Sequence, residues 1–447
     1  MGKIALIALV GNEDTGVNLP EGTYLRQANL SLFRNYDQYD VSLHAFLKSL
    51  KKLKLEPSEL SMDLLVIAAV MYGADTRINR KDFAEDGWTR IIDLFIPVSD
   101  VSVWNNQKEN LERIFKFLTG DIWTVIFRPR AGTDLQLSPR GKLKRYKMPY
   151  ETDTVCLFSG GMDSFIGAID LLESNVRPLL VGHKKSGDVS KFQKICGDAL
   201  VAAYPLLSPQ QISTHIAIPK TNLFDSQEDT ERGRSFLFLT LGAICASVLN
   251  ANSTLVVPEN GMISLNIPLT PLRTGSHSTR TTHPFYFSKM QQLFNALNLG
   301  VKISNPYQYQ TKGEMLTNCK NKSLVVNTET MSCSHPSGRY EGLGNLHCGY
   351  CVPCIIRKAA FLASEQQDKY PYRTEIIGHQ GLSIAKAEGA DILAFKFMVE
   401  KVKKNPNFLT AAIRLTGPLG EDVLPFIDLY SRSLIEVNNL IKQVKLI

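Results

Sequence analysis

The chain has 447 residues, a length typical of two or three domains. Hydrophobic residues make up 44% and charged residues 21%, which is ordinary for a globular protein with a buried core, and the net charge of +7 selects no class of function by itself. No stretch reaches the roughly eighteen apolar residues of a membrane helix, and the apolar run at 4–10 is too short for a secretion signal, so we expect a cytoplasmic protein.

The first part of the chain, residues 1–145, mixes strand-like and helical patterns without a recognisable group of catalytic side chains. We predict an accessory α+β domain here, with enough apolar elements to fold alone. The basic run at 140–147 follows, and we interpret it as a solvated linker and expect no direct nucleic-acid binding. The elements expected in this part are strands at 4–10, 90–98 and 123–127 and helices at 60–72 and 105–118.

Strands and helices alternate in the central part, residues 150–370. This alternation predicts an α/β fold with a doubly wound parallel sheet and crossover helices. Ligands bind such sheets at the carboxyl ends of the strands, so the first strand-to-helix turn is where we expect chemistry. The predicted strands lie at 154–158, 178–181, 212–218 and 254–257, and the helices run up to 172, over 189–204 and over 234–249.

That first turn has the sequence Ser159-Gly160-Gly161-Met162-Asp163-Ser164. Two glycines let the backbone approach a ligand closely, and the amides at the start of the following helix favour an anion. A carboxylate beside phosphates needs a compensating partner, so Asp163 is expected to cap an amide or to help hold Mg²⁺. The pattern therefore predicts a phosphate-binding loop, and no Walker A sequence occurs in the chain.

Four of the eight cysteines crowd into one short window: Cys333, Cys348, Cys351 and Cys354. Without an export signal, this crowding favours a metal site over disulfides. Four thiolates would close a tetrahedral Zn²⁺ site, which implies a structural role. A redox pair would not need four cysteines, whereas the spacing leaves an iron–sulfur cluster open as the alternative to zinc.

The last part, residues 371–447, has mainly helical patterns, clearest at 391–403 and 423–442. We predict a helical C-terminal extension.

The six-residue loop resembles the PP-loop of the N-type ATP pyrophosphatases, the adenine nucleotide alpha hydrolase-like family that includes tRNA lysidine synthetase, GMP synthetase, asparagine synthetase and QueC, the 7-cyano-7-deazaguanine synthase. The resemblance implies adenylation of a substrate oxygen, release of pyrophosphate and displacement of AMP by a nucleophile.

The cysteine pattern is similar to that of QueC-like enzymes, in which C-G-x-C-x-x-C is followed by an arginine, here Arg357. Two weaker matches are Arg234 to Thr240, which resembles the family's R-N-x-x-F-L-S helix start, and Thr311 to Glu314, which resembles its T-K-x-E stretch. Together these matches cover about residues 152–365. They imply a PP-loop domain with a zinc-binding insertion.

The chain also departs from QueC, since about 150 residues precede and about 80 follow the part that resembles it. Where QueC has a G-Y-x-D-C-R-P stretch, this chain has the sequence at 280–284 (RTTHP), which puts the substrate pocket in doubt. The extended architecture resembles the QueC-like proteins of bacterial anti-phage systems, first those of the Qat type (QatC proteins) and second those of one CBASS class.

The resemblance implies a carbon–nitrogen ligase that uses ATP and Mg²⁺, activates the carboxylate of 7-carboxy-7-deazaguanine and transfers the acyl group to an amine, including an amine on a partner protein of a defence operon. Ser159, Gly160, Gly161, Met162 and Ser164 would bind the phosphates, with Asp163 supporting Mg²⁺ or the loop. Arg234 and Lys312 would neutralise phosphate or carboxylate, and His183 would lie near adenine or substrate. Ordinary surface charge and a simple loop histidine are the alternatives for these last three residues.

Other functions stay open at this stage. A housekeeping 7-cyano-7-deazaguanine synthase, a tRNA-modifying PP-loop enzyme and a nucleotide-binding scaffold in a defence complex would each carry the same loop. The tRNA-modifying enzyme would need a catalytic cysteine or an RNA-binding appendage, and neither is evident.

Overall fold

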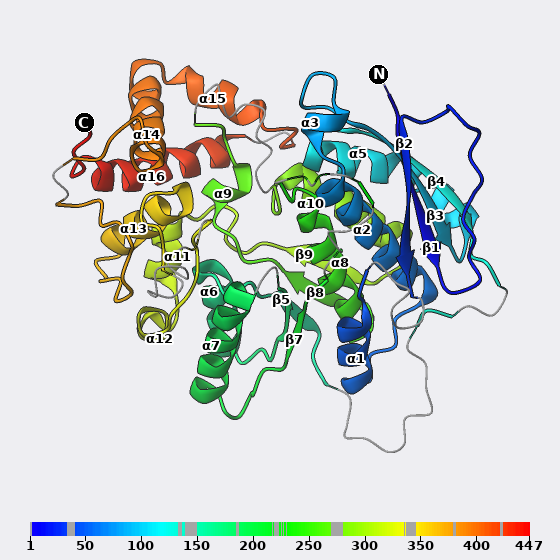
Figure 1. Ribbon diagram of the computed structural model, residues 1–447. Coiled ribbons are helices and arrows are strands. Elements are labelled where there is room, and N and C mark those ends of the chain that lie inside the picture. The colour runs from blue at the N-terminus through cyan, green and yellow to red at the C-terminus, as the bar shows by residue number, and fades with distance from the viewer. Residues whose placement is uncertain are drawn as a thin grey trace.

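The protein is represented by a computed structural model (Figure 1). The predicted linker at 140–147 lies outside the described residues. The structure describes residues 2–33, 41–132, 136–138, 150–184, 187–216, 218, 223–224, 226, 228, 230–269, 280–334, 336, 346–378, 381–420 and 423–447.

The N-terminal part contains a four-stranded sheet in the order β2-β1-β3-β4, and all of its strand pairs are parallel. The prediction of an α+β domain is therefore corrected to an α/β arrangement, because helices connect β2 to β3 and β3 to β4. The strands are β1 (Ile4–Val10), β2 (Arg26–Leu32), β3 (Ile91–Val98) and β4 (Ile122–Pro129), and the helices are α1 (His44–Lys52), α2 (Glu59–Arg77), α3 (Arg80–Phe83), α4 (Val101–Asn105) and α5 (Lys108–Thr119).

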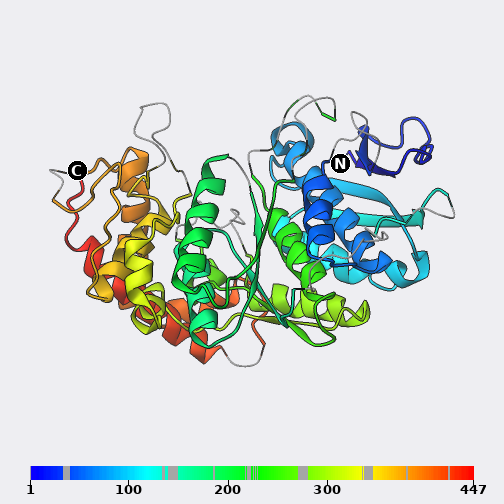
Figure 2. The same cartoon turned by 90° about the horizontal axis from the view of Figure 1, so that it is seen from below.

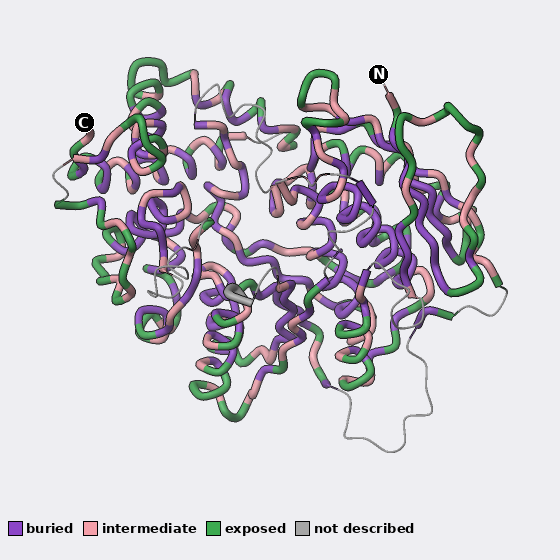
Figure 3. The backbone as a smooth tube through the Cα atoms, viewed as in Figure 1, coloured by how far each residue is buried: buried purple, intermediate pink, exposed green. Residues whose placement is uncertain are grey.

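Helix α2 joins the N-terminal sheet to the rest of the protein. It is buried almost along its whole length, from Ser61 to Thr76, and it packs between that sheet and helix α8 (Arg234–Ala246). One hydrophobic core consequently runs from the first sheet into the second (Figure 3). Removing residues 1–145 would therefore expose the apolar face of α8, whereas independent folding of these residues stays a prediction.

The central part contains a five-stranded parallel sheet in the order β7-β6-β5-β8-β9. This confirms the predicted doubly wound parallel sheet. The first strand of the sheet lies in the middle, so the strand order reverses between β5 and β8, where such folds form a crevice for ligands. The strands are β5 (Thr154–Leu157), β6 (Leu179–His183), β7 (Gln211–Thr214), β8 (Ser253–Val256) and β9 (Val301–Ser304).

Helices lie on both faces of the sheet that contains β5 (Figure 2), and alternate residues at this strand belong to two different cores. Val155 and Leu157 belong to the core shared with α8, whereas Cys156 and Phe158 pack with α6 and α7 on the other side. The sheet is thus covered on both faces, as a parallel sheet requires. Besides α8, its helices are α6 (Met162–Glu173), α7 (Gly187–Ala203), α9 (Gly261–Leu265), α10 (Pro284–Ala296), α11 (Lys312–Asn318), α12 (Lys322–Asn327) and α13 (Val352–Ala363).

The C-terminal part is helical, as predicted. It consists of α14 (Ala387–Lys404), α15 (Asn407–Arg414) and α16 (Leu424–Ile441), which share a core with α9 and α13. In the part of the chain that the structure describes, no helix has the length and hydropathy that crossing a membrane requires.

Candidate phosphate pocket and cysteine cluster

The turn after β5 has a backbone that requires glycine at Gly160. Its φ is +79°, and a Cβ at this position would lie 2.7 Å from the backbone nitrogen of Gln193 on α7. The carbonyl of Gly160 accepts a hydrogen bond from the Met331 amide at 2.9 Å. Contacts from α7 and from the segment before the cysteines therefore fix the shape of the loop.

The two serines of the turn, Ser159 and Ser164, are hydrogen-bonded to each other. Their hydroxyl oxygens are 3.1 Å apart, the amide of Ser159 donates to Ser164 Oγ at 3.2 Å, and the amide of Gly161 donates to Ser159 Oγ at 3.2 Å. Helix α6 begins directly after Gly161, which supplies no capping side chain. The first residues of α6 also line a pocket, and a helix start without a capping side chain is an arrangement that can bind phosphate.

Asp163 connects this helix to the other side of the crevice. Its carboxylate accepts hydrogen bonds from Asn260 Nδ2 at 2.7 Å and from the Asn260 amide at 3.2 Å, and it forms an ion pair of 2.5 Å with Lys312 Nζ. Burial raises the pKa of Asp163, but the Lys312 ammonium and the Asn260 hydrogen bonds outweigh it, so the net pKa lies below the ordinary value. Asp163 is therefore a carboxylate at neutral pH.

These groups line one pocket of about 310 Å³ at the carboxyl ends of β5 and β8. Its position matches the place where the strand order reverses. All of the predicted catalytic residues lie together here, although 153 positions separate Ser159 from Lys312. The lining consists of Ser159, Gly161, Met162, Asp163, Ser164, Arg234, Pro258, Glu259, Asn260, Ile263, Lys312, Met331, Ser332, Pro353 and Ile356.

His183 lies behind the pocket and does not line it. Arg234 donates from Nε to His183 Nδ1 at 3.3 Å and from Nη2 to the His183 carbonyl at 3.1 Å. Burial, reinforced by the Arg234 charge, lowers the pKa of His183 to about 3, so the imidazole is neutral. His183 therefore contacts Arg234 of the pocket lining, and its predicted place near a cofactor stays a prediction.

Glu259 and Asn260, which follow β8, were not predicted from the sequence. Both are polar and stand directly after a predicted strand, and this is the signal that could have found them. Glu259 accepts a hydrogen bond from the Thr282 hydroxyl, and burial together with the nearby Asp163 charge raises the pKa of Glu259 to about 7, although the Thr282 hydrogen bond opposes this. The pocket thus holds two carboxyl groups whose pKa values differ widely.

The stretch at 280–284, which replaces the QueC motif, has mainly structural contacts. His283 caps α10 by accepting from the Phe285 amide at 3.2 Å, and its Nε2 is 3.0 Å from the Thr416 hydroxyl. Thr282 alone reaches the pocket, through Glu259. Any change in substrate recognition caused by this stretch would therefore act through the Thr282–Glu259 contact.

The four cysteines predicted to bind metal lie together beside the pocket. Their Sγ atoms all lie within 4.8 Å of one another, and the Cys333–Cys351 and Cys348–Cys354 sulfurs are each 3.9 Å apart. A tetrahedral site with Zn–S bonds of about 2.3 Å has sulfurs about 3.8 Å apart. The sulfurs therefore already have the spacing of a closed zinc site, and Cys348, Cys351 and Cys354 are buried.

We expect the purified protein to contain about one zinc per chain, because four thiolates complete the tetrahedral coordination of Zn²⁺. Elemental analysis checks this, and iron with a visible absorbance band would contradict it. Cys351→Ser should lose the zinc and lower solubility, whereas Cys245→Ser, which changes a buried cysteine of the shared core, should keep the metal.

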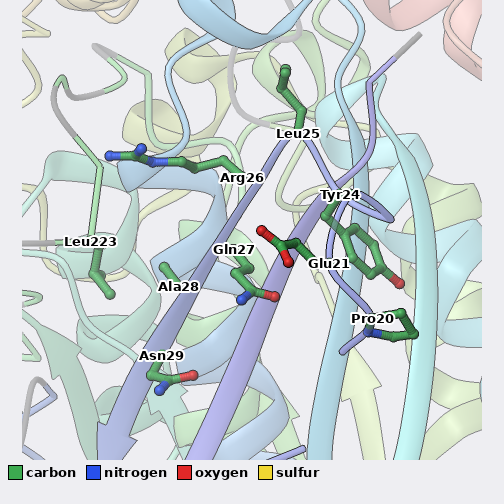
Figure 4. Close-up of a pocket in the computed structure, with 10 residues that line it drawn as sticks. Pro20, Glu21, Tyr24, Leu25, Arg26, Gln27, Ala28, Asn29 and Leu223 are labelled. Carbon is green, nitrogen blue, oxygen red and sulfur yellow. The ribbon is translucent and has the colours of Figure 1, made fainter. Parts of the chain in front are cut away.

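A second pocket, of about 540 Å³, lies along the edge strand β2 (Figure 4). Its lining includes Glu21, Gln27 and Asn29, together with Tyr24, whose hydroxyl donates to Asp93 at 2.9 Å. The lining contains no glycine-serine loop at a helix start and no lysine–aspartate pair. We therefore regard the pocket between β5 and β8 as the candidate active site.

Comparison with protein families agrees with part of this picture. The family model described as "Queuosine biosynthesis protein QueC" matches residues 281–365, a range that includes Lys312 and all four clustered cysteines but begins well after the loop at 159–164. A comparison with curated proteins finds no match. Over residues 281–365, the chain is QueC-like.

Proposed function

We propose that the protein is an AMP-forming ligase that uses the pocket between β5 and β8 to bind ATP and to activate a carboxylate. The observation that carries this proposal is the ion pair of 2.5 Å between Asp163 of the glycine-serine loop and Lys312. Lys312 comes from the QueC-like segment, so the pair places that segment beside the loop. The family match favours a 7-carboxy-7-deazaguanine-type substrate.

The proposed reaction has two steps. A carboxylate oxygen of the substrate attacks the α-phosphorus of ATP, and pyrophosphate leaves with the bonding electrons. An amine then attacks the acyl carbon, AMP leaves and the amine loses a proton. The helix amides after Gly161 would hold the pyrophosphate, while Lys312 and Arg234 would neutralise the charge that develops on it.

Magnesium fits the acidic groups of the pocket. Mg²⁺ in nucleotide sites is held by one or two carboxylates together with the phosphates, and Asp163 and Glu259 both line this pocket. Burial raises the pKa of Glu259 most, and the Asp163 charge adds a repulsion that a bound cation would relieve. When bound, the ion would offset the negative charge on the phosphates.

The experiment is ATP–pyrophosphate exchange in the presence of 7-carboxy-7-deazaguanine. Exchange that depends on this compound and is absent with the corresponding nitrile, which has no carboxylate, supports the proposal. Exchange at the same rate with and without this compound, or exchange that needs an unrelated carboxylate, would overturn the substrate assignment.

We further propose that the protein serves an anti-phage system of the Qat type and that residues 1–145 hold the acceptor protein. Support comes from the extra N-terminal α/β part and from its exposed surface beside β2, where Leu25 is 62% exposed. A protein amine must be held close to the acyl-adenylate, whereas ammonia needs no docking surface.

Because the core is shared with α8, a point variant tests this docking better than a truncation. Leu25→Asp should leave ATP–pyrophosphate exchange unchanged but reduce acyl transfer to a protein encoded by a neighbouring gene by about 10-fold, the effect of losing about 1.4 kcal/mol of binding. Leu206→Asp, at an exposed leucine outside the N-terminal part, is the control. Equal transfer by both variants and the wild type contradicts docking at this surface.

A further inference from the structure

Lys312 stands at the first position of helix α11, and its placement depends on how that helix begins. The Thr311 hydroxyl caps the helix by accepting a hydrogen bond from the Glu314 amide at 3.0 Å. The Glu314 carboxylate in turn accepts a hydrogen bond from the Thr311 amide at 2.9 Å. This is a capping box, and it fixes the direction of the backbone at Lys312. Thr311 is fully buried and Lys312 is 7% exposed.

A carboxylate from the C-terminal extension reaches the same helix start. Glu436 of α16 accepts a hydrogen bond from the Thr311 hydroxyl and another from the Gly313 amide at 3.2 Å. The residues on both sides of Lys312 are therefore held by one side chain that is more than 120 positions away in the sequence. A carboxylate at a helix N-terminus is also favoured by the helix dipole.

The fit between α11 and α16 requires a glycine. A Cβ at Gly313 would lie 2.5 Å from Glu436 Oε1, so any larger residue would push the carboxylate away. One turn earlier on α16, Arg432 forms an ion pair with Glu314 and donates to the Tyr309 carbonyl at 3.0 Å. Glu436 and Arg432 of α16 thus both contact α11 and the turn before it.

We propose that Glu436 is a positioning residue for the active site and that the C-terminal extension holds Lys312 where it meets Asp163 and the phosphates. Lys312 Nζ is 2.5 Å from Asp163 Oδ1, and a displacement of about 1 Å at such a site can cost about 100-fold in rate. The role assigned to Lys312 rests on the proposed function, whereas the coupling between Glu436 and Lys312 can be measured by nucleotide binding alone.

The experiment is a double-mutant cycle. Glu436→Ala, Lys312→Met and the double variant are compared by calorimetry for affinity toward a non-hydrolysable ATP analogue with Mg²⁺, and by kcat and KM for pyrophosphate exchange. If Glu436 acts through Lys312, Glu436→Ala should weaken binding by about 10-fold in the wild-type chain and have little effect in the Lys312→Met chain. Equal effects in both chains would overturn the proposal.

Two further variants separate positioning from folding. Glu436→Gln keeps an acceptor oxygen for the Thr311 hydroxyl and the Gly313 amide, so we expect affinity within about 3-fold of wild type. Asn439→Ala, at an exposed position on the same helix, is the matched control and should change nothing. If Glu436→Ala does not fold, the cycle is run with Gly313→Ala, whose Cβ would displace the Glu436 carboxylate, and a loss that persists in the Lys312→Met chain contradicts the proposal. A wild type that binds the analogue but catalyses no exchange refutes only the proposed function.

Discussion

Replacing Asp163 with alanine is expected to lower ATP cleavage by at least about 100-fold while the protein stays folded. The carboxylate holds both Lys312 and Asn260 in the pocket, so its loss releases both groups from the proposed site of charge development. Removal of a single preorganised electrostatic group at such a site costs about 100- to 1000-fold in rate. The measurement is the rate of AMP formation, accompanied by the thermal unfolding midpoint.

Asp198→Ala is the control for this prediction, because Asp198 forms an ion pair with Lys194 in which both side chains are exposed. That variant should cleave ATP at the wild-type rate. Wild-type activity in Asp163→Ala would show that this pocket is not the catalytic site.

Replacing Arg90 with methionine is expected to have the largest effect on stability. Arg90 is fully buried and its guanidinium contacts Asp121 at 2.5 Å and Asp75 at 3.0 Å, both of which are also fully buried. Removing Arg90 leaves Arg80, which pairs with Asp121 at 2.8 Å and with Asp75 at 3.7 Å, to compensate two buried carboxylates. Loss of one partner of such a buried network costs about 3 to 5 kcal/mol of the free energy of unfolding. Denaturant unfolding measures this loss.

The same variant tests whether the N-terminal part is integral to the active site. Asp75 also accepts a hydrogen bond from the Gly233 amide at 2.7 Å, one residue before Arg234 of the pocket. Arg90→Met should therefore weaken nucleotide binding as well as stability. Arg113→Met, which breaks an exposed pair with Glu109, should change neither, and unchanged stability in Arg90→Met would contradict the account of the shared core.

The local features of this protein could be predicted from the sequence. The loop at 159–164 and the cysteine spacing are local sequence motifs. The alternation of strand-like and helical patterns after residue 154 predicted the doubly wound sheet. Edge strand β2 was missed because its first four residues are polar or partly exposed and show no apolar alternation. The parallel arrangement of the N-terminal sheet was also missed, since β1 and β2 are joined without a helix.

The rest of the site depends on contacts between distant parts of the chain. Glu259 and Asn260 enter the pocket only because β8 lies next to β5, and the strand order cannot be read from periodicity. The contacts of Glu436 with the start of α11 depend on how α16 packs against α13. His183 was placed correctly at the end of a strand, but its orientation toward Arg234 follows from packing under Tyr72 of α2.

Three surrounding parts of the protein converge on one small pocket. The N-terminal part reaches it through Asp75 and Gly233, the cysteine segment through Met331, and the C-terminal extension through Glu436. These contacts reach the backbone of the loop at Gly160 and the residues next to Arg234 and Lys312, the basic side chains that line the pocket.

The position at which ATP is cleaved tests the central claim most directly. The proposed phosphate loop has two serine hydroxyls 3.1 Å apart before a helix start, and the chain has no Walker A lysine. We therefore expect ATP to be cleaved to AMP and pyrophosphate. The measurement is chromatography of the nucleotide products after incubation with ATP, Mg²⁺ and 7-carboxy-7-deazaguanine. We predict AMP and pyrophosphate in equal amounts, and ADP with inorganic phosphate as the main products would contradict the account.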